Sequence, residues 1–237
     1  MKVTVIIPVY NEINSIDILL EKVLKTNIKK QIIVVDDFST DGSRDIITEK
    51  FQNKIDIIIL HEYNQGKGAA IKSAQKHVSG DYVIIQDADL EYDPDQYELF
   101  INEVKKNNYK AIYGSRVLKK GKFFNVQNFS HKIRIWGNIF LTFLSNKINN
   151  QNLTDAHTCY KMLESKIFKS LVLKEKGFAF CPEVTTKLSN LGINIFEIPI
   201  NYEGRTYKEG KKITAIDGFK AIAALIRYRF FEKKWPY

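Results

Sequence analysis

The sequence predicts an α/β fold: a mainly parallel, doubly wound sheet flanked by helices in a single domain. Two observations lead to this prediction. Short runs rich in β-branched residues alternate with segments whose apolar residues recur at helical spacing over residues 3–113. Across all 237 residues the sequence has no internal repeat and no linker rich in Pro, Gly or Ser. Because strands separated by helices of this length pair in parallel through right-handed crossovers, we expect one domain with halves at residues 1–116 and 117–237.

The predicted strands are continuous apolar runs, because a parallel strand is buried on both faces. They span residues 3–9, 32–35, 55–60, 82–85 and 111–113. Predicted helices lie between them at residues 13–24, 41–51, 68–78 and 93–105, and Pro94 suits the first turn of the last one. In the second half we expect an amphipathic helix at residues 131–148, a strand at 193–201 and a helix with a basic tail at 213–231.

The chain is basic. It has 36 Lys and Arg against 27 Asp and Glu, which gives a formal net charge of +9. This excess suggests an anionic partner, either nucleic acid, a phosphorylated substrate or an anionic membrane, although a solvated basic surface accounts for it equally well. The basic residues concentrate at residues 205–212 and 227–234.

The sequence also predicts a compartment. Cys159 and Cys181 are too few for a disulfide framework or a zinc site. The N-terminal residues enter a strand pattern at once, without the layout of a signal peptide. No run reaches the roughly 20 apolar residues that cross a bilayer. We therefore expect a cytoplasmic protein.

The strongest local signal is an acidic cluster directly after the predicted strand at residues 82–85. Asp87, Asp89 and Glu91 alternate along the chain, so an extended backbone directs them to one side. Carboxylates held together repel one another, whereas a hard divalent cation prefers such oxygen ligands. The alternative is a polar loop that ends a strand, because a lone pair of aspartates at this spacing is common.

Two weaker signals follow other strands. Asp36 and Asp37 end the strand at residues 32–35, and their carboxylates could accept hydrogen bonds from a base or a ribose. Residues 64–68 (Asn-Gln-Gly-Lys-Gly) lack the ending of a phosphate-binding P-loop. A tight turn before a helix is the default interpretation, and a backbone cradle near a nucleotide, formed around Gly66 and Lys67, is the alternative.

Taken in order, these motifs resemble a known family, the family-2 glycosyltransferases of the GT-A fold. The motifs are residues 8–12 (Pro-Val-Tyr-Asn-Glu), 35–42 (Val-Asp-Asp-Phe-Ser-Thr-Asp-Gly), 64–68, and 80–82 (Gly-Asp-Tyr) leading to 87–89 (Asp-Ala-Asp). The second half resembles the dolichyl-phosphate mannose synthase branch. Its motifs are residues 114–116 (Gly-Ser-Arg), 155–161 (Asp-Ala-His-Thr-Cys-Tyr-Lys), 180–183 (Phe-Cys-Pro-Glu), 205–207 (Arg-Thr-Tyr) and 210–213 (Gly-Lys-Lys-Ile).

The resemblance implies a role for each matching residue. The nucleotide would be bordered by Pro8, Tyr10, Glu12, Asp36, Asp37, Gly66, Lys67 and Asp87. Mg²⁺ or Mn²⁺ would be held by Asp87, Asp89 and Glu91, although some members carry Gln at the third position. The acceptor would be bound by Arg116, Arg134, Asp155, Glu183, Arg205, Lys211 and Lys212. Catalysis would depend most on Asp89, Arg116, Arg205 and Lys212.

The reaction that the resemblance implies is inverting transfer of mannose or glucose from a GDP- or UDP-linked donor to a polyprenyl or dolichyl phosphate. A phosphate acceptor needs cations and no general base, because its second pKa is about 6. One alternative is a hydroxyl acceptor, for which Asp155 or Glu183 would be the base. A sugar-phosphate nucleotidyltransferase is disfavoured by Tyr10-Asn11-Glu12 after the first strand, where a Gly-rich loop with Arg and Lys is expected. A nucleic-acid binder is disfavoured because the acidic cluster would repel a polyanion.

We also expect peripheral association with the cytoplasmic face of a membrane. In the predicted helix at residues 131–148, Ile135, Ile139 and Phe143 are expected to pack inward. Trp136, Phe140 and Leu144 would then face the interface, with Arg134 directed to lipid phosphate. The tail at residues 227–237 mixes aromatic and basic residues, a combination that suits the same interface.

Overall fold

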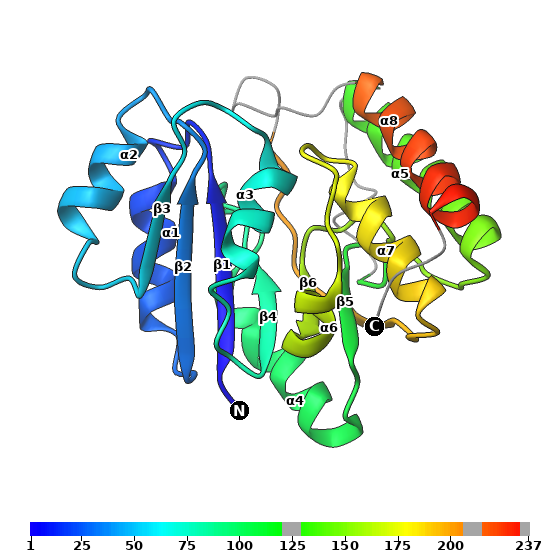
Figure 1. Ribbon diagram of the computed structural model, residues 1–237, viewed down its shortest axis with the longest axis horizontal. Helices are drawn as coiled ribbons and strands as arrows, with labels where there is room; N and C mark the ends of the chain where they lie inside the picture. The colour runs from blue at the N-terminus through cyan, green and yellow to red at the C-terminus, as the bar shows by residue number, and fades with distance from the viewer. Residues whose placement is uncertain (120–128, 206–214, 233–237) are drawn as a thin grey trace.

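The computed structural model describes residues 1–119, 129–205 and 215–232, with the side chains of 129–134 and 215 left out. Seven strands form one sheet in the order β3-β2-β1-β4-β6-β5-β7 (Figure 1). The strands are β1 (Val3–Val9), β2 (Lys30–Asp36), β3 (Ile57–Leu60), β4 (Tyr82–Ile85), β5 (Ala111–Ser115), β6 (Lys161–Glu164) and β7 (Phe196–Pro199). All pairings are parallel except those of β6, which runs antiparallel to β4 and β5. The α/β fold with a mainly parallel sheet is confirmed.

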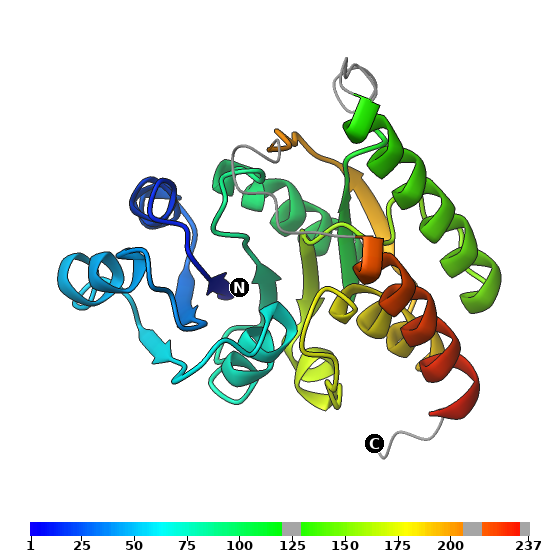
Figure 2. The ribbon, with the colours of Figure 1, turned by 90° about the horizontal axis from the view of Figure 1, so that it is seen from above.

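Helices cover both faces of the sheet (Figure 2). One face carries α1 (Ile16–Lys25) and α4 (Tyr97–Asn107), and the other carries α3 (Lys67–Gln75), α6 (Ser165–Ser170) and α7 (Phe180–Asn190). A short turn of α-helix, α2 (Ser43–Asp45), continues as a π-helix over Ile46–Lys50 beside α1. Alternate residues of β1 divide between the two cores: Val5 and Ile7 pack with α1, and Ile6 packs with α3. This alternation fixes which polar residues beyond the strand ends share a side.

Helices α5 (Phe129–Asn149) and α8 (Ala215–Ile226) lie side by side at the edge of the molecule and contact α7 (Figures 1 and 2). A π-helix over Arg227–Phe231 continues α8. In the described part of the chain, no helix has the length and apolarity to cross a membrane. The predicted helices at residues 131–148 and 213–231 correspond to α5 and to α8 with its extension.

Three elements were not predicted: β6, α6 and α7. Strand β6 begins at Lys161, a charged residue that is nonetheless buried. Its ammonium donates to the carbonyl of Ala156 at 3.0 Å and lies 3.6 Å from the ring centroid of Tyr113. A strand that begins with a buried lysine lacks the apolar pattern from which a buried strand is predicted. The predicted strand at residues 193–201 is shorter in the structure, because only Phe196–Pro199 pairs with β5.

Helix α7 is buried along nearly its whole length, including its polar residues. Glu183 and Lys187 form a fully buried ion pair one turn apart. The Glu183 carboxylate also accepts the backbone N–H groups of Lys174 at 2.7 Å and Glu175 at 2.9 Å. The structure thus corrects the expectation that Glu183 binds the acceptor or acts as a base, because its oxygens are occupied by interior partners.

Replacing Glu183 by Ala is expected to lower the free energy of unfolding by about 3–5 kcal/mol, because the Lys187 ammonium would stay buried without a carboxylate. Urea denaturation measures this change. The double variant Glu183→Leu with Lys187→Met removes both charges and is the control, since it should recover much of the loss. An unchanged midpoint in Glu183→Ala would contradict the structural role of this carboxylate.

Candidate active site

A pocket of about 430 Å³ opens beyond the carboxyl ends of β1 and β4. Most of the residues predicted for the site line it: Pro8, Tyr10, Glu12, Asp37, Gly66, Lys67, Asp87, Asp89, Glu91, Arg116 and Arg205. Asp36, Asp155 and Glu183 are fully buried and do not line it. Lys211, Lys212 and the side chain of Arg134 lie outside the described residues. The polar strand ends therefore meet in one place, as the parallel sheet requires.

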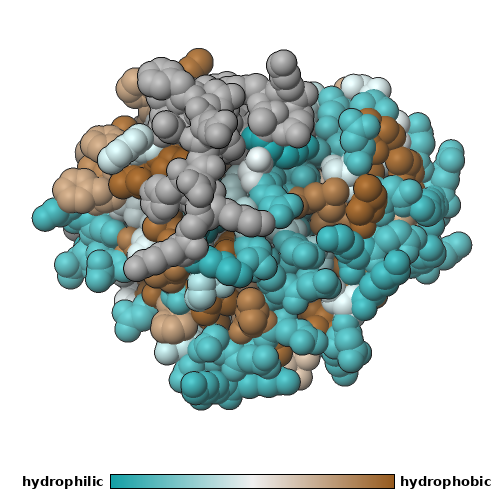
Figure 3. All heavy atoms as spheres, turned by 180° about the vertical axis from the view of Figure 1, so that it is seen from behind, coloured by the Kyte–Doolittle hydropathy of each residue, from teal (hydrophilic) through white to brown (hydrophobic). Residues whose placement is uncertain are grey.

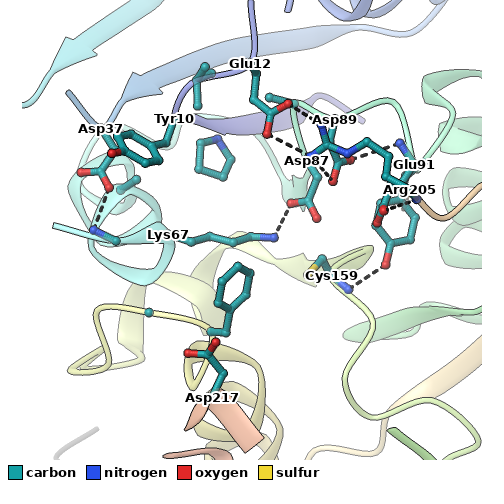
Figure 4. A pocket seen from close by; sticks show the side chains of 18 of the residues that line it. Tyr10, Glu12, Asp37, Lys67, Asp87, Asp89, Glu91, Cys159, Arg205 and Asp217 are labelled. Atoms are coloured by element: carbon teal, nitrogen blue, oxygen red, sulfur yellow. Dashed lines mark hydrogen bonds and ion pairs between the residues drawn. The ribbon is translucent and has the colours of Figure 1, made fainter. Parts of the chain in front are cut away.

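Among the residues that the structure describes, Lys67 and Arg205 pair with the acidic cluster (Figure 4). Asp87 forms an ion pair with Lys67, which opens helix α3. Asp89 accepts from Nη2 of Arg205 at 3.3 Å. The same guanidinium makes two bonds to the Glu12 carboxylate, at 2.7 Å and 3.0 Å. Arg205 therefore lies between an acid that follows β1 and an acid that follows β4.

The Glu91 carboxylate is held by two residues from the second half of the chain. The residue before it, Leu90, has a φ of +61°, a left-handed conformation that breaks the alternation expected of an extended chain. The Glu91 carboxylate accepts from the hydroxyl of Tyr202 at 2.8 Å and from the backbone N–H of Arg205 at 2.7 Å. Within the described residues, no group of three His, Cys, Asp or Glu side chains is placed to hold a metal ion. In this arrangement Glu91 anchors Tyr202 and Arg205, and its role as a third ligand stays a prediction.

The remaining pair, Asp87 and Asp89, fits a divalent cation. Burial, together with the negative charges of Asp87 and Glu91, raises the pKa of Asp89 to about 7, although Arg205 opposes this shift. A raised pKa means that the ionised carboxylate is unstable where it lies. A bound cation would relieve this, and carboxylate oxygens are the ligands that Mg²⁺ and Mn²⁺ prefer. The donor set therefore suits such an ion, with two acidic ligands from the protein.

At the other end of the pocket, only one of the two adjacent aspartates at the carboxyl end of β2 reaches the lining. Asp37 accepts the backbone N–H groups of Gln65 at 2.9 Å and Gly66 at 2.7 Å, and it contacts Nδ1 of His61 at 2.7 Å. Asp36 is fully buried, where it accepts from Nε of Arg44 at 2.6 Å. Its expected contact with the nucleotide is therefore corrected to an interior ion pair.

The glycines of residues 64–68 have a packing role. A Cβ added to Gly66 would lie 2.5 Å from the carbonyl oxygen of Lys176, and one added to Gly68 would lie 2.2 Å from that of Glu175. Gly66 also has a φ of +94°, which favours glycine. Its N–H is already donated to Asp37. The loop is thus a tight turn before α3, and Lys67 is the residue that it directs into the pocket.

The side of the pocket next to the end of β5 is built around Arg116. Its Nε and Nη2 donate to the Asp155 carboxylate at 2.6 Å and 2.8 Å, and its guanidinium lies 5.0 Å from the ring centroid of Tyr202. Burial raises the pKa of Asp155, but the charge and hydrogen bonds of Arg116 together with the hydrogen bond from Asn138 lower it, so the pKa lies below its usual value. Asp155, expected at the acceptor or as a base, is instead the buried partner of Arg116.

Sequence reasoning missed several residues of the lining. They are Asn64, His157, Cys159, Phe178, Tyr202 and Asp217. His157 and Cys159 lie within the motif at residues 155–161, and Asn64 lies within 64–68, so these motifs gave a signal for their position. No motif indicated a position in the pocket for Phe178 or for Asp217 on α8. The ring centroid of Phe178 lies 5.9 Å from Nζ of Lys67. They reach the pocket through folding of the second half.

Solved structures with the same fold support this architecture. The chain aligns with glucosyl-3-phosphoglycerate synthase from Mycobacterium tuberculosis, solved with Mn²⁺, UDP and phosphoglyceric acid, with a TM-score of 0.70 and 14% identity over 97% of this chain and 78% of that one. It also aligns with TarS from S. aureus, solved with UDP-GlcNAc, with a TM-score of 0.61 and 20% identity over 98% of this chain and 68% of that one. At these identities the likeness shows a shared GT-A fold.

Sequence comparisons identify the family. The undecaprenyl-phosphate mannosyltransferase of Micrococcus luteus is 26% identical over 96% of this chain and 94% of its own length. The dolichyl-phosphate beta-glucosyltransferase ALG5D of Trichomonas vaginalis is 27% identical over 97% of this chain and 73% of its own length. The family model for glycosyl transferase family 2 matches residues 4–172. The chain belongs to glycosyl transferase family 2.

Proposed function

We propose that this glycosyltransferase moves a hexose, mannose or glucose, from a GDP- or UDP-linked donor to a polyprenyl phosphate, with inversion at the sugar carbon. The observation that carries the proposal is the arrangement of the pocket. It places an acidic pair suited to a divalent cation, Asp87 and Asp89, in the same cavity as two arginines, Arg116 and Arg205. Relatives that act on undecaprenyl phosphate and dolichyl phosphate support the choice of acceptor.

The donor would bind along the carboxyl ends of β1, β2 and β4. Tyr10 and Asp37 border the part of the pocket assigned to the nucleoside. Asp87 and Asp89 would hold Mg²⁺ or Mn²⁺, which as a Lewis acid stabilises the charge that develops on a leaving diphosphate. Lys67, whose ammonium pairs with Asp87, lies beside the same position and would add a second positive charge there.

The acceptor would bind on the side of Arg116 and Arg205. A phosphate monoester is largely dianionic at neutral pH, because its second pKa is about 6, so it can attack without a general base. A hydroxyl acceptor would need one. The two carboxylates considered for that task, Asp155 and Glu183, are fully buried and ion-paired. This favours the phosphate acceptor over the hydroxyl acceptor.

An apolar face on α5 and α8 supports peripheral membrane association. Large apolar side chains are exposed on both helices: Trp136, Phe140 and Phe143 on α5, and Ile216, Phe219 and Ile226 on α8. Figure 3 shows apolar side chains gathered at this edge of the molecule, in the upper left of the view. Phe143 is exposed, contrary to the inward packing expected of it, and Leu144 is only partly exposed. Such a face suits a membrane surface, here the cytoplasmic one.

The proposed reaction is tested by incubating the protein with Mn²⁺, a polyprenyl phosphate and either GDP-mannose or UDP-glucose. We expect sugar in the lipid extract, and an anomeric signal in the proton NMR spectrum that reports a β-linkage formed from the α-linked donor. Transfer only to a saccharide hydroxyl, or an α-linked lipid product, would overturn the proposal.

Replacing Asp89 by Asn is expected to abolish high-affinity Mn²⁺ binding in the presence of nucleoside diphosphate, because a direct ligand is lost. Electron paramagnetic resonance of free Mn²⁺ measures this binding. Glu91→Gln is the matched variant, and it should weaken binding by no more than the roughly 10–100-fold that loss of a supporting contact costs. Equal loss in both variants would identify Glu91 as a further ligand of the ion.

Replacing Phe140 on α5 or Phe219 on α8 by Asp is expected to weaken binding to vesicles that contain anionic lipid. Removing one buried Phe from the interface costs about 1.5–3 kcal/mol, or roughly 10–100-fold in partitioning. Vesicle flotation measures the bound fraction. Leu99→Asp adds the same charge to an exposed apolar position on α4 and should bind like the parent protein. An equal loss in this control would argue against a specific lipid-facing surface.

A further inference from the structure

The inner face of α5 forms hydrogen bonds to the loop that contains Asp155, the partner of Arg116. Three polar side chains one turn apart make these contacts. Asn138 donates through Nδ2 to Oδ1 of Asp155 at 3.1 Å, and Thr142 accepts from the backbone N–H of Ala156 at 3.3 Å. Asn146 donates to the carbonyl of Leu153 at 2.8 Å and accepts from its N–H at 2.9 Å. The stripe of residues 138, 142 and 146 thus faces inward, opposite the exposed apolar side chains of the same helix.

Only the first of these contacts reaches the Asp155 carboxylate. Oδ1 of Asp155, which accepts from Asn138, also accepts from Nη2 of Arg116. Asp155 is fully buried, so a change in the donors around its carboxylate changes the position it offers to the guanidinium. Arg116 in turn lies over the ring of Tyr202, whose hydroxyl donates to Glu91. A continuous series of contacts therefore runs from α5 to the acidic cluster.

We propose that Asn138 is a positioning residue, which acts through Asp155 to hold the Arg116 guanidinium where it meets the acceptor phosphate. The inference rests on the proposed function for the identity of the acceptor. Under this proposal, α5 has two roles: its outer face contacts the lipid surface, and its inner face positions Arg116 for the lipid's phosphate. Asn138 itself touches no substrate in this arrangement, because its amide is directed to Asp155.

The test compares Asn138→Leu, which keeps the size of the side chain and removes the donor, with Asn146→Leu on the same helix. Asn146 grips the same loop without touching Asp155. Loss of a hydrogen bond to a charged group should raise the KM for polyprenyl phosphate roughly tenfold in Asn138→Leu. The KM for the sugar donor and the kcat should stay unchanged. Asn146→Leu should lower the melting temperature and leave the acceptor KM at the parent value.

A second measurement does not depend on the acceptor. The ¹⁵Nε–H signal of Arg116, assigned from its absence in Arg116→Lys, should shift or broaden in Asn138→Leu and stay in place in Asn146→Leu. An unaltered signal and acceptor KM in Asn138→Leu would overturn the positioning role, as would equal effects of both variants. If the parent protein does not use polyprenyl phosphate, the proposed function fails, and the Arg116 signal still decides the role of Asn138.

Discussion

The site depends on balancing negative charge in a partly buried space. Carboxylates that follow β1 and β4 meet beyond the sheet, where their negative charges repel one another unless cations lie beside them. The chain supplies Lys67 from the start of α3 and Arg205 from beyond β7. Arg205 pairs with Glu12, a residue 193 positions away in sequence. This ion pair joins the two halves of the chain at the pocket, so the geometry of the site depends on how the two halves pack together.

Most of the first half of the fold could be predicted from the sequence, because its strands are apolar runs and its helices have one apolar face. The second half resisted prediction for a physical reason. Helix α7 is buried although it contains Thr185, Thr186 and an ion pair, so its sequence resembles that of a half-exposed helix. Strand β6 is similar, because its buried Lys161 is stabilised by an aromatic ring and a carbonyl that lie elsewhere in the chain.

The sequence predicted where the site residues lie along the edge of the sheet, but it predicted less well where their side chains point. Acidic residues after parallel strands must lie at one edge of the sheet, and this rule placed Asp37, Asp87 and Asp89 in the lining. It does not say which way a side chain turns. Leu90 adopts a positive φ directly before Glu91, so the chain there is not extended. Arg116 forms an ion pair with Asp155, which takes the Asp155 carboxylate out of the lining. A sequence motif predicts neither the conformation of Leu90 nor the pairing of Asp155 with an arginine 39 residues away.

Arg116 and Arg205, two arginines that line the pocket, are held in different ways. Asp155, the partner of Arg116, is fully buried behind it, so a ligand in the pocket does not compete for that carboxylate. Glu12 and Asp89, the partners of Arg205, both line the pocket. Any cation that binds Asp89 competes with Arg205 and weakens one of its contacts. Arg116 is therefore paired with a carboxylate that lies outside the pocket lining, whereas Arg205 is paired with carboxylates that are part of it.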